Sequence, residues 1–235
     1  MSKLFEELDY QVTDIGAVSL RRRRILSLDK DVWEVLLGDE HLMSSLFTAS
    51  EVALAQLGLA ALGEAPAEGW DVVVGGLGLG YTAATVLEDA RVGCLRVVEL
   101  LAPVIEWHEK RLVPLDPPLV ADKRCRVVEG DFFALAASDE GFGGPQDAIL
   151  IDIDHTPDWL LDQRSGSFYS EEGLAKLARH LKPGGVMGLW SDARADEAFV
   201  ARMAKVFSNA WSEPVTFHNP LQDKPFTQTV YLART

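Results

Sequence analysis

The stretch Asp71-Val-Val-Val-Gly-Gly-Leu-Gly-Leu-Gly80-Tyr-Thr decides the fold of this chain. Its three valines form a β-branched run with turn residues directly after it, which predicts a short buried strand. Residues 81–87 are predicted to form a helix, and between strand and helix lies a G-x-G-x-G loop of Gly76, Gly78 and Gly80. Glycines let the backbone turn sharply, and the start of a helix has N–H groups without intrahelical partners. Strand, glycine loop and helix therefore predict a nucleotide cradle.

Two acidic residues further along the chain support this prediction. The segment Arg96-Val-Val-Glu99 ends a second strand in an acid about twenty residues after the loop, the spacing expected of a carboxylate that accepts both hydroxyls of a ribose. A third predicted strand ends in Gly130-Asp131, which a nicotinamide-dependent dehydrogenase does not need. The alternative is a doubly wound α/β domain in which these acids are only solvated strand ends.

The glycine loop and the two acids together resemble the S-adenosylmethionine-binding fold of class I methyltransferases. The similarity spans most of residues 70–191. The resemblance implies that the loop glycines Gly76, Gly78 and Gly80 hold the methionine part of the cofactor. It also implies that Glu99 holds the ribose and that Asp131 touches the adenine.

The composition limits the possible partners. The chain has 235 residues and a formal net charge of −14, so it should repel phosphate backbones, and we expect no nucleic-acid partner. The acidity suits a cationic small molecule, but it also serves ordinary solubility. No apolar run reaches about eighteen residues, which predicts no membrane partner. Cys94 and Cys125 are expected to be buried reduced thiols, and with the acidic first residues they favour a cytoplasmic location.

The order of the predicted elements indicates the fold class. Residues 13–37 are predicted to form antiparallel strands in a small N-terminal β-hairpin domain, residues 1–48. Residues 49–235 alternate between strands and helices, which indicates a doubly wound, mostly parallel seven-stranded sheet with right-handed crossovers. Ser50 is the expected N-cap of a helix over residues 51–62, and Ser170 that of a helix over residues 171–181. The predicted class is α/β with a Rossmann-like methyltransferase fold.

The whole chain resembles the spermidine synthase family, the polyamine aminopropyltransferases, in which a small β-domain precedes a methyltransferase-like domain. Leu28-Asp-Lys-Asp-Val-Trp and Gly38-Asp-Glu40 are similar to the family's Leu-Asp-Gly…Gln…Asp-Glu hairpin. The segments 98–106 and 126–132 resemble its second and third strands. The stretch from Phe168-Tyr-Ser-Glu-Glu to Lys182-Pro-Gly-Gly-Val resembles the segment before its fifth strand.

The substrate-side motifs of that family are replaced. The family loop reads Gly-Gly-Gly-Asp-Gly-Gly, with an Asp that serves the amine end of the cofactor, and Gly78 stands in the place of this Asp. The hairpin Gln corresponds to Trp33, and the Tyr-His-Glu that follows Asp-Glu corresponds to Met43-Ser-Ser45. The family's Asp-Ser-Ser-Asp-Pro, whose second Asp deprotonates the attacking amine, corresponds to Asp152-Ile-Asp-His-Thr-Pro157.

The candidate chemical site follows the fourth strand of the predicted sheet. In an open α/β sheet the ligand lies beyond the carboxyl ends of the strands, where Asp152, Asp154 and His155 are expected. His155, or Asp154 if the register shifts by one residue, stands at the general-base position that the resemblance implies; a surface histidine is the alternative. The segment also resembles metal-dependent catechol-type O-methyltransferases, in which Asp192 would be a further Mg²⁺ ligand. We expect no metal, because the Asn of that site is missing.

The sequence thus predicts a transferase that binds S-adenosylmethionine or its decarboxylated form and alkylates, most simply methylates, a small-molecule acceptor. The alternatives are a true polyamine aminopropyltransferase that uses decarboxylated S-adenosylmethionine and a non-catalytic nucleoside-binding or structural homodimer. A homodimer is expected because apolar side chains occupy both faces of one N-terminal strand. One face carries Trp33, Val35 and Leu37, and the other carries Val32, Glu34 and Leu36.

Overall fold

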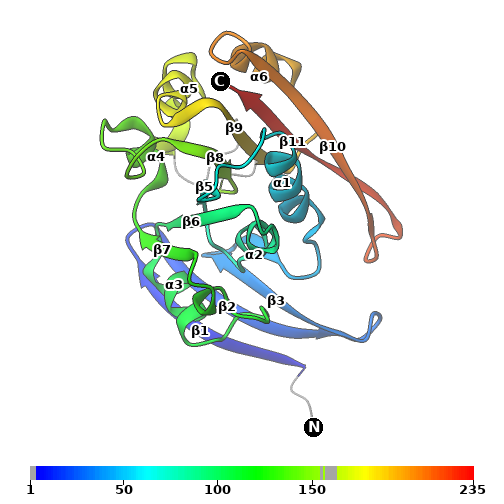
Figure 1. Ribbon diagram of the computed structural model, residues 1–235. Helices are drawn as coiled ribbons and strands as arrows, with labels where there is room; N and C mark the ends of the chain where they lie inside the picture. The colour runs from blue at the N-terminus through cyan, green and yellow to red at the C-terminus, as the bar shows by residue number, and fades with distance from the viewer. Residues whose placement is uncertain (1–3, 154–155, 157–162) are drawn as a thin grey trace.

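Two β-sheets organise the chain in the computed structural model, which describes residues 4–153, 156 and 163–235 (Figure 1). The larger sheet has seven strands in the order β10-β11-β9-β8-β5-β6-β7. Their bounds are Asn209–Asn219, Lys224–Arg234, Leu181–Ser191, Gln146–Ile151, Trp70–Gly75, Val92–Glu99 and Cys125–Glu129. Strands β9, β8, β5, β6 and β7 run parallel, and β10 and β11 form an antiparallel hairpin at one edge. The predicted doubly wound, mostly parallel seven-stranded sheet is confirmed.

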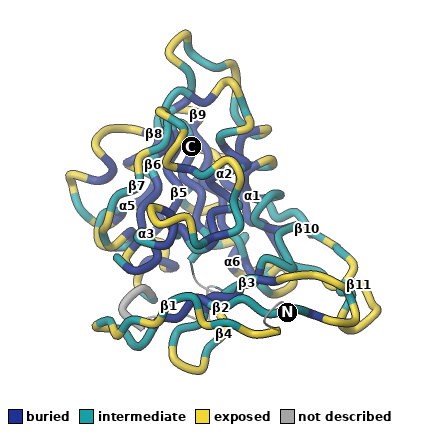
Figure 2. The backbone as a smooth tube through the Cα atoms, turned by 90° about the horizontal axis from the view of Figure 1, so that it is seen from below, coloured by how far each residue is buried: buried dark blue, intermediate teal, exposed yellow. Residues whose placement is uncertain are grey.

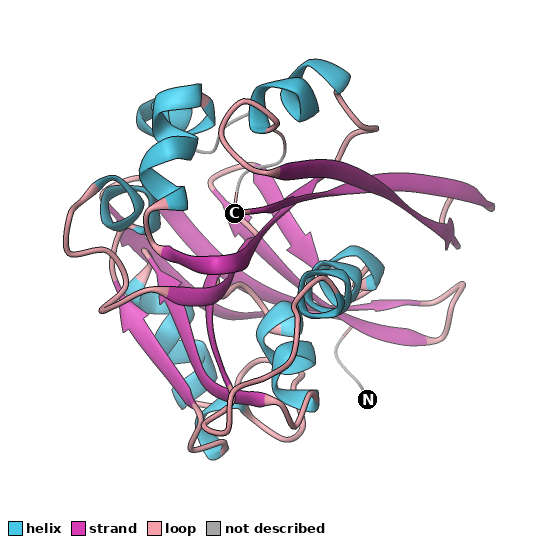
Figure 3. Cartoon of the chain, turned by 45° about the horizontal axis from the view of Figure 1, so that its top comes forward, coloured by secondary structure: helices cyan, strands magenta, loops and turns pink. Residues whose placement is uncertain are grey.

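Helices cover both faces of this sheet (Figure 3). On one face lie α1 (Ala49–Ala60), α2 (Tyr81–Glu88) and α3 (Ala102–Glu109), and on the other lie α4 (Phe132–Ala137), α5 (Glu171–Ala178) and α6 (Glu197–Met203). Successive strand residues point to opposite faces, so Val72 and Val74 enter the first core and Val73 enters the second. Figure 2 shows that the buried segments are concentrated in the central strands. Burial on both faces explains why β5 is a continuous valine run.

The smaller sheet is built from the N-terminal residues and has the order β1-β2-β3-β4. The bounds are Phe5–Thr13, Gly16–Ile25, Lys30–Leu37 and Glu40–Ser44. The predicted small antiparallel sheet is confirmed, and it is larger than residues 13–37 because β1 and β4 flank the expected strands. The sheet packs against α3, where Trp107 Nε1 donates to Asp9 Oδ2 over 2.7 Å. Trp33 Nε1 likewise donates to the Leu112 carbonyl oxygen over 3.0 Å.

Helix boundaries differ from the prediction in one place that concerns the site. The N-cap of α1 is Thr48, and no side chain caps this helix, so the predicted Ser50 cap is wrong. Ser50 is fully buried, and its hydroxyl is used in a tertiary contact instead, donating to Gln228 Oε1 of β11. Ser170 caps α5 as predicted, with its hydroxyl accepting from Gly173 N over 3.1 Å. A cap signal read from sequence does not reveal a competing partner that is distant in the chain.

The apolar residues of the N-terminal sheet are distributed differently from the expectation. Val32 is only 1% exposed, because β3 is an inner strand and the side chain of Arg23 lies opposite it and reaches Glu34. The exposed apolar side chains lie instead on β1, directly before it and directly after β2: Leu4, Phe5, Tyr10, Val12 and Leu26. The exposed apolar surface of this sheet therefore lies on β1 and not on β3.

No helix within the described residues is long and apolar enough to cross a membrane.

Candidate functional site

A cavity of about 600 Å³ lies beyond the carboxyl ends of the parallel strands. It opens where β5 lies between β6 and β8, the point at which the order of the sheet reverses and at which α/β proteins bind ligands. The walls come from the ends of β5, β6, β7, β8 and β9, from the first turns of α1, α2 and α4, and from β4 of the N-terminal sheet. The small sheet thus closes one side of a site that the large sheet builds.

The glycine loop forms the floor of this cavity. Gly76 and Gly78 line it, with φ of 90° and 46°, values that L side chains rarely adopt. A Cβ built at Gly76 would overlap the carbonyl oxygen of Asp152, so strand β8 leaves room only for glycine. Gly80, the N-cap of α2, does not line the cavity; a Cβ there would meet His108, Leu115 and Leu119 behind the loop. Two of the three predicted glycines therefore face the ligand space, and the third serves packing.

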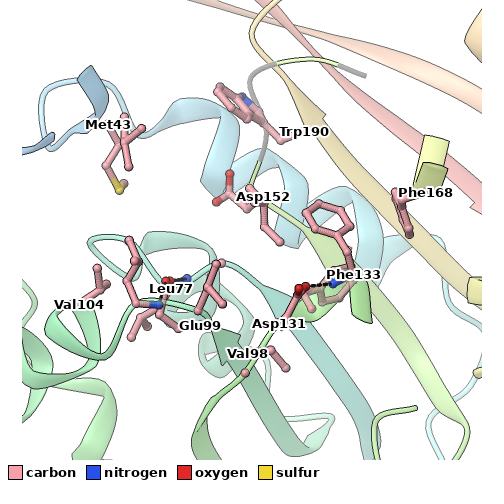
Figure 4. Close-up of a pocket in the computed structure, with 18 of the residues that line it drawn as sticks. Met43, Leu77, Val98, Glu99, Val104, Asp131, Phe133, Asp152, Phe168 and Trp190 are labelled. Carbon is pink, nitrogen blue, oxygen red and sulfur yellow. Dashed lines mark hydrogen bonds between the residues drawn. The ribbon is translucent and has the colours of Figure 1, made fainter. Parts of the chain in front are cut away.

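Glu99 is the acid nearest to this loop. Its side chain lines the cavity and is 8% exposed, and its two carboxylate oxygens accept from Leu77 N over 2.8 Å and Leu101 N over 2.9 Å (Figure 4). Burial raises the pKa of Glu99, while the backbone N–H groups work in the opposite direction. Each oxygen keeps a further lone pair, so the carboxylate can accept ligand hydroxyls without giving up the loop.

Asp131 and Asp152 occupy the neighbouring strand ends, as expected. Asp131 lines the cavity and caps α4, accepting from Phe133 N over 2.9 Å and Ala134 N over 3.0 Å. Asp152 follows β8, and Thr82 Oγ1 donates to its Oδ2 over 2.6 Å. Burial raises the pKa of Asp152 to about 6, although the Thr82 hydrogen bond stabilises the ionised form.

The other residues expected after β8, Asp154 and His155, lie outside the described residues. Two aromatic side chains, Trp190 and Phe168, also line the cavity (Figure 4). Within the described part of the chain, no group of three or more His, Cys, Asp or Glu side chains is arranged to hold a metal ion.

Met43 of β4 covers the glycine loop from the small sheet. Leu79 N donates to Met43 Sδ over 3.0 Å, and a Cβ at Gly78 would overlap the same sulfur atom. The thioether therefore occupies the space that a longer residue at Gly78 would need (Figure 4). The contact leaves no local signal in the sequence, because Met43 and Leu79 are 36 residues apart in the chain.

His108 fixes the loop from the opposite side. Its Nε2 lies 2.9 Å from the carbonyl oxygen of Gly78, and the side chain is 2% exposed. Because a carbonyl oxygen only accepts, Nε2 carries the proton and donates it. Burial lowers the pKa of His108, which favours the neutral ring, while the bond to Gly78 opposes this shift.

A polar network connects the rim of the cavity to α1. Gln228 Nε2 donates to Asp192 Oδ1 over 2.5 Å, and Gln228 Oε1 accepts from Ser50 and from Trp190 Nε1, the latter over 3.4 Å. Asp192, which the sequence suggested as a possible Mg²⁺ ligand, therefore accepts a hydrogen bond from the side-chain amide of Gln228. A further acid, Glu51 in the first turn of α1, also lines the cavity. Acidic residues are common in the first turn of a helix, where they interact favourably with the helix dipole, and the local sequence does not distinguish Glu51 from these.

Solved structures of other proteins share this fold. A spermidine synthase in complex with the transition state analogue AdoDATO matches with a TM-score of 0.73 and 18% identity, over 97% of this chain and 73% of the other. The spermidine synthase of Thermotoga maritima matches with a TM-score of 0.70 and 17% identity, over 97% and 72%. A probable spermidine synthase from Corynebacterium glutamicum ATCC 13032 matches with a TM-score of 0.64 and 16% identity, over 97% and 79%.

The chain has a spermidine synthase-like fold. The match covers both sheets, so the likeness extends to the small N-terminal sheet as well as to the seven-stranded sheet. At these identities it establishes the fold and leaves the chemistry to the residues of the site. No family model matches the sequence, and no curated protein is similar enough to be matched.

Within this spermidine synthase-like fold, the departures noted in the sequence have structural counterparts. The loop position that carries Asp in the family is Gly78, and Met43 fills the space above it. Trp33, in the place of the hairpin Gln, is used to dock the small sheet on Leu112. At the first position the space of a side chain is therefore taken by Met43, and at the second a docking contact replaces a polar anchor.

Proposed function

We propose that this chain is a transferase that binds an S-adenosyl sulfonium nucleoside and moves an alkyl group from it to a small-molecule acceptor. The observation that carries the proposal is Glu99, a buried carboxylate that is fixed by Leu77 N and Leu101 N and faces the cavity beside the glycine loop. Burial of a carboxylate costs free energy, and a buried acid that is fixed beside a cavity is a typical feature of functional sites. The spermidine synthase-like fold supports the same conclusion.

The residues present fit such a nucleoside. The absence of a side chain at Gly76 lets a ligand approach the loop backbone, and Glu99 accepts hydroxyl groups. The described lining is strongly acidic, with Glu51, Glu99, Asp131, Asp152, Glu172 and Asp192, whereas its only lysine, Lys176, pairs with Glu172 over 2.7 Å. This excess of negative charge suits a positively charged ligand. Such a donor supplies an activated carbon next to a positively charged sulfur atom.

The tail of the donor distinguishes methyl from aminopropyl transfer. S-adenosylmethionine carries a carboxylate on its tail, and the decarboxylated form does not. Met43 Sδ already takes the N–H of Leu79, one of the loop donors that a tail carboxylate could use. The described lining acids around Asp152 also repel a carboxylate and attract an ammonium group. These contacts support the decarboxylated form, although Gly78 lacks the carboxylate that the related loops offer to an amine.

The proposal predicts a specific binding profile. Titration calorimetry should show binding of at least one of four nucleosides: S-adenosylmethionine, S-adenosylhomocysteine, methylthioadenosine and decarboxylated S-adenosylmethionine. We expect decarboxylated S-adenosylmethionine to bind more tightly than S-adenosylmethionine. If none of the four binds, the proposed function is wrong.

Turnover is then assayed with the tightest-binding sulfonium and a pool of polyamines, other amines and catechols, with detection of methylthioadenosine and S-adenosylhomocysteine by mass. Product formation that disappears in Asp131→Ala identifies an enzyme and excludes a protein that only binds nucleosides. Binding without any product favours the non-catalytic alternative.

We also propose that the chain forms a homodimer through the outward face of β1. Phe5 and Tyr10 are each 55% exposed and Val12 is 79% exposed, and a two-fold contact is the commonest way to cover such a face. Light scattering at micromolar concentration should give a dimer for the wild type and a monomer for the double variant Tyr10→Asp/Val12→Asp. Val120→Asp, at a 49% exposed valine of another element, is the control and should remain dimeric. A monomeric wild type would contradict the proposal.

A further inference from the structure

Glu51 has no assigned role, yet it lies where the chemistry is expected. It belongs to the first turn of α1, which packs on α2, β8, β9 and β11, and its side chain lines the cavity. The hydroxyl oxygen of Thr82 lies 3.5 Å from the Glu51 carbonyl oxygen and 2.6 Å from Asp152 Oδ2. Thr82 therefore joins the start of α1 to the end of β8, and the side chains of Glu51 and Asp152 line the same cavity.

The two carboxyls of this pair have different environments. Asp152 accepts the Thr82 hydroxyl, which favours its ionised form. Among the described residues, no side chain donates a hydrogen bond to the Glu51 carboxyl. Burial, followed by the negative charge of Asp152, raises the pKa of Glu51 to about 8. Burial therefore favours a shared proton on this pair, and the Thr82 hydrogen bond to Asp152 makes Glu51 the favoured site for it.

The groups around Glu51 leave it sensitive to any positive charge that enters. From α2 it faces Tyr81, whose pKa is raised first by burial and further by the charge of Glu51, and Thr82. Asp152 follows β8, Asp192 follows β9, Gln228 lies on β11, and His41 of β4 lines the same cavity. His41 is 3.7 Å from Glu34, and Lys176 pairs with Glu172. In the described lining, no arginine and no other lysine is present to neutralise the pair.

We propose that Glu51 is the proton acceptor of the transfer reaction, and that positive charge in the cavity switches it from its neutral to its ionised form. This inference rests on the proposed function. A sulfonium ligand brings the missing positive charge, so Glu51 releases its proton to solvent when the ligand binds. During transfer the carbon–sulfur bond breaks, its electron pair stays on sulfur, and the carbon bonds to the acceptor nitrogen or oxygen. The acceptor proton goes to the Glu51 carboxylate as the positive charge on sulfur is lost.

Loss of the sulfonium charge has a consequence for the timing of proton transfer. While the charge is present, Glu51 is a weak base and does not hold a proton. Once sulfur becomes neutral, burial and Asp152 again favour the protonated form of Glu51. The basicity of Glu51 therefore rises together with the acidity of the alkylated acceptor, which is when a proton must move.

Proton release on binding tests the inference without any knowledge of the acceptor. Calorimetry at pH 7 in two buffers with different ionisation enthalpies counts protons. The sulfonium that binds is compared with the thioether that has the same tail, namely S-adenosylhomocysteine or its decarboxylated form. In the wild type the sulfonium should release up to about one more proton than the thioether. Equal release by both ligands would overturn the inference but not the proposed function, whereas absence of binding by every nucleoside would overturn both.

Substitutions of Glu51 and Asp152 test whether the extra proton comes from these two carboxyls. Glu51→Gln should bind the sulfonium and release no extra proton. Asp152→Asn should reduce the extra release, because the negative charge of Asp152 is one of the two causes that favour the protonated form of Glu51. Glu88→Gln, at an exposed acid at the far end of α2, is the matched control and should behave as the wild type. Extra release that persists in Glu51→Gln would assign the proton to another group and refute the inference.

The catalytic role has its own measurement. With an acceptor from the turnover assay and saturating sulfonium, Glu51→Gln should lower kcat by roughly 100-fold, the contribution expected of a general base. Unchanged kcat in Glu51→Gln would show that Glu51 is not the proton acceptor. The same assay on His155→Gln separates the two candidates, because a complete loss there with normal turnover in Glu51→Gln would assign the role to His155.

Discussion

Replacement of Gly76 by alanine is expected to abolish nucleoside binding and to lower the melting temperature by roughly 5–20 °C. Gly76 has a φ of 90°, and alanine in that conformation costs about 1–3 kcal/mol. In addition, the new Cβ would overlap the carbonyl oxygen of Asp152, a backbone atom that cannot rotate away. Such overpacking typically costs a further 1–3 kcal/mol or so. Strand β8 and the glycine loop would move apart, which separates Asp152 from Thr82.

The matched control is Gly184→Ala. Gly184 also has a positive φ, 78°, but nothing lies within 4 Å of a Cβ built there. This variant shares the backbone strain of Gly76→Ala and lacks the overlap, so it should lose less stability and retain nucleoside affinity. Melting curves followed by circular dichroism, together with calorimetry well below the melting temperature, distinguish the two effects. Equal behaviour of the two variants would mean that contact with Asp152 does not matter.

Glu99→Gln is expected to weaken nucleoside binding by roughly 10- to 200-fold, because a hydrogen bond to a charged group contributes about 1.5–3 kcal/mol. An amide has only one acceptor oxygen, whereas Glu99 uses both oxygens to accept from Leu77 N and Leu101 N. The amide NH₂ would therefore face a backbone donor, and the loop would lose its anchor as well as its acceptor for ligand hydroxyls.

Glu129→Gln provides the control for this effect. Glu129 pairs in register with Glu99 at the end of the adjacent strand β7, but its side chain is exposed and does not line the cavity. Titration calorimetry of both variants with the same nucleoside is the measurement. A Glu99→Gln protein that is folded and binds as tightly as Glu129→Gln would show that Glu99 does not contact the ligand.

Local sequence patterns were sufficient to predict the strands of the seven-stranded sheet. The valine run at residues 72–74, the glycines after it and the acids that end β6 and β7 each describe a short segment whose structure depends mainly on its own residues. Alternation of such segments with helices leaves few possible topologies, because crossovers between parallel strands are right-handed. Glu99, Asp131 and Asp152 could be placed for the same reason, since parallel strands end at one edge of the sheet.

Only the tertiary structure shows the contacts between segments that are distant in sequence. Met43 reaches the loop across 36 residues, Thr82 reaches Asp152 across 70, and Ser50 reaches Gln228 across 178. Glu51 shows the limit most clearly, because in sequence it is an ordinary acid at the start of a helix. Its altered pKa arises only from packing, which buries the carboxyl and places Asp152 beside it. Sequence by itself determined the fold and the acids at the strand ends, and packing determined which of those acids has a neighbour that changes its chemistry.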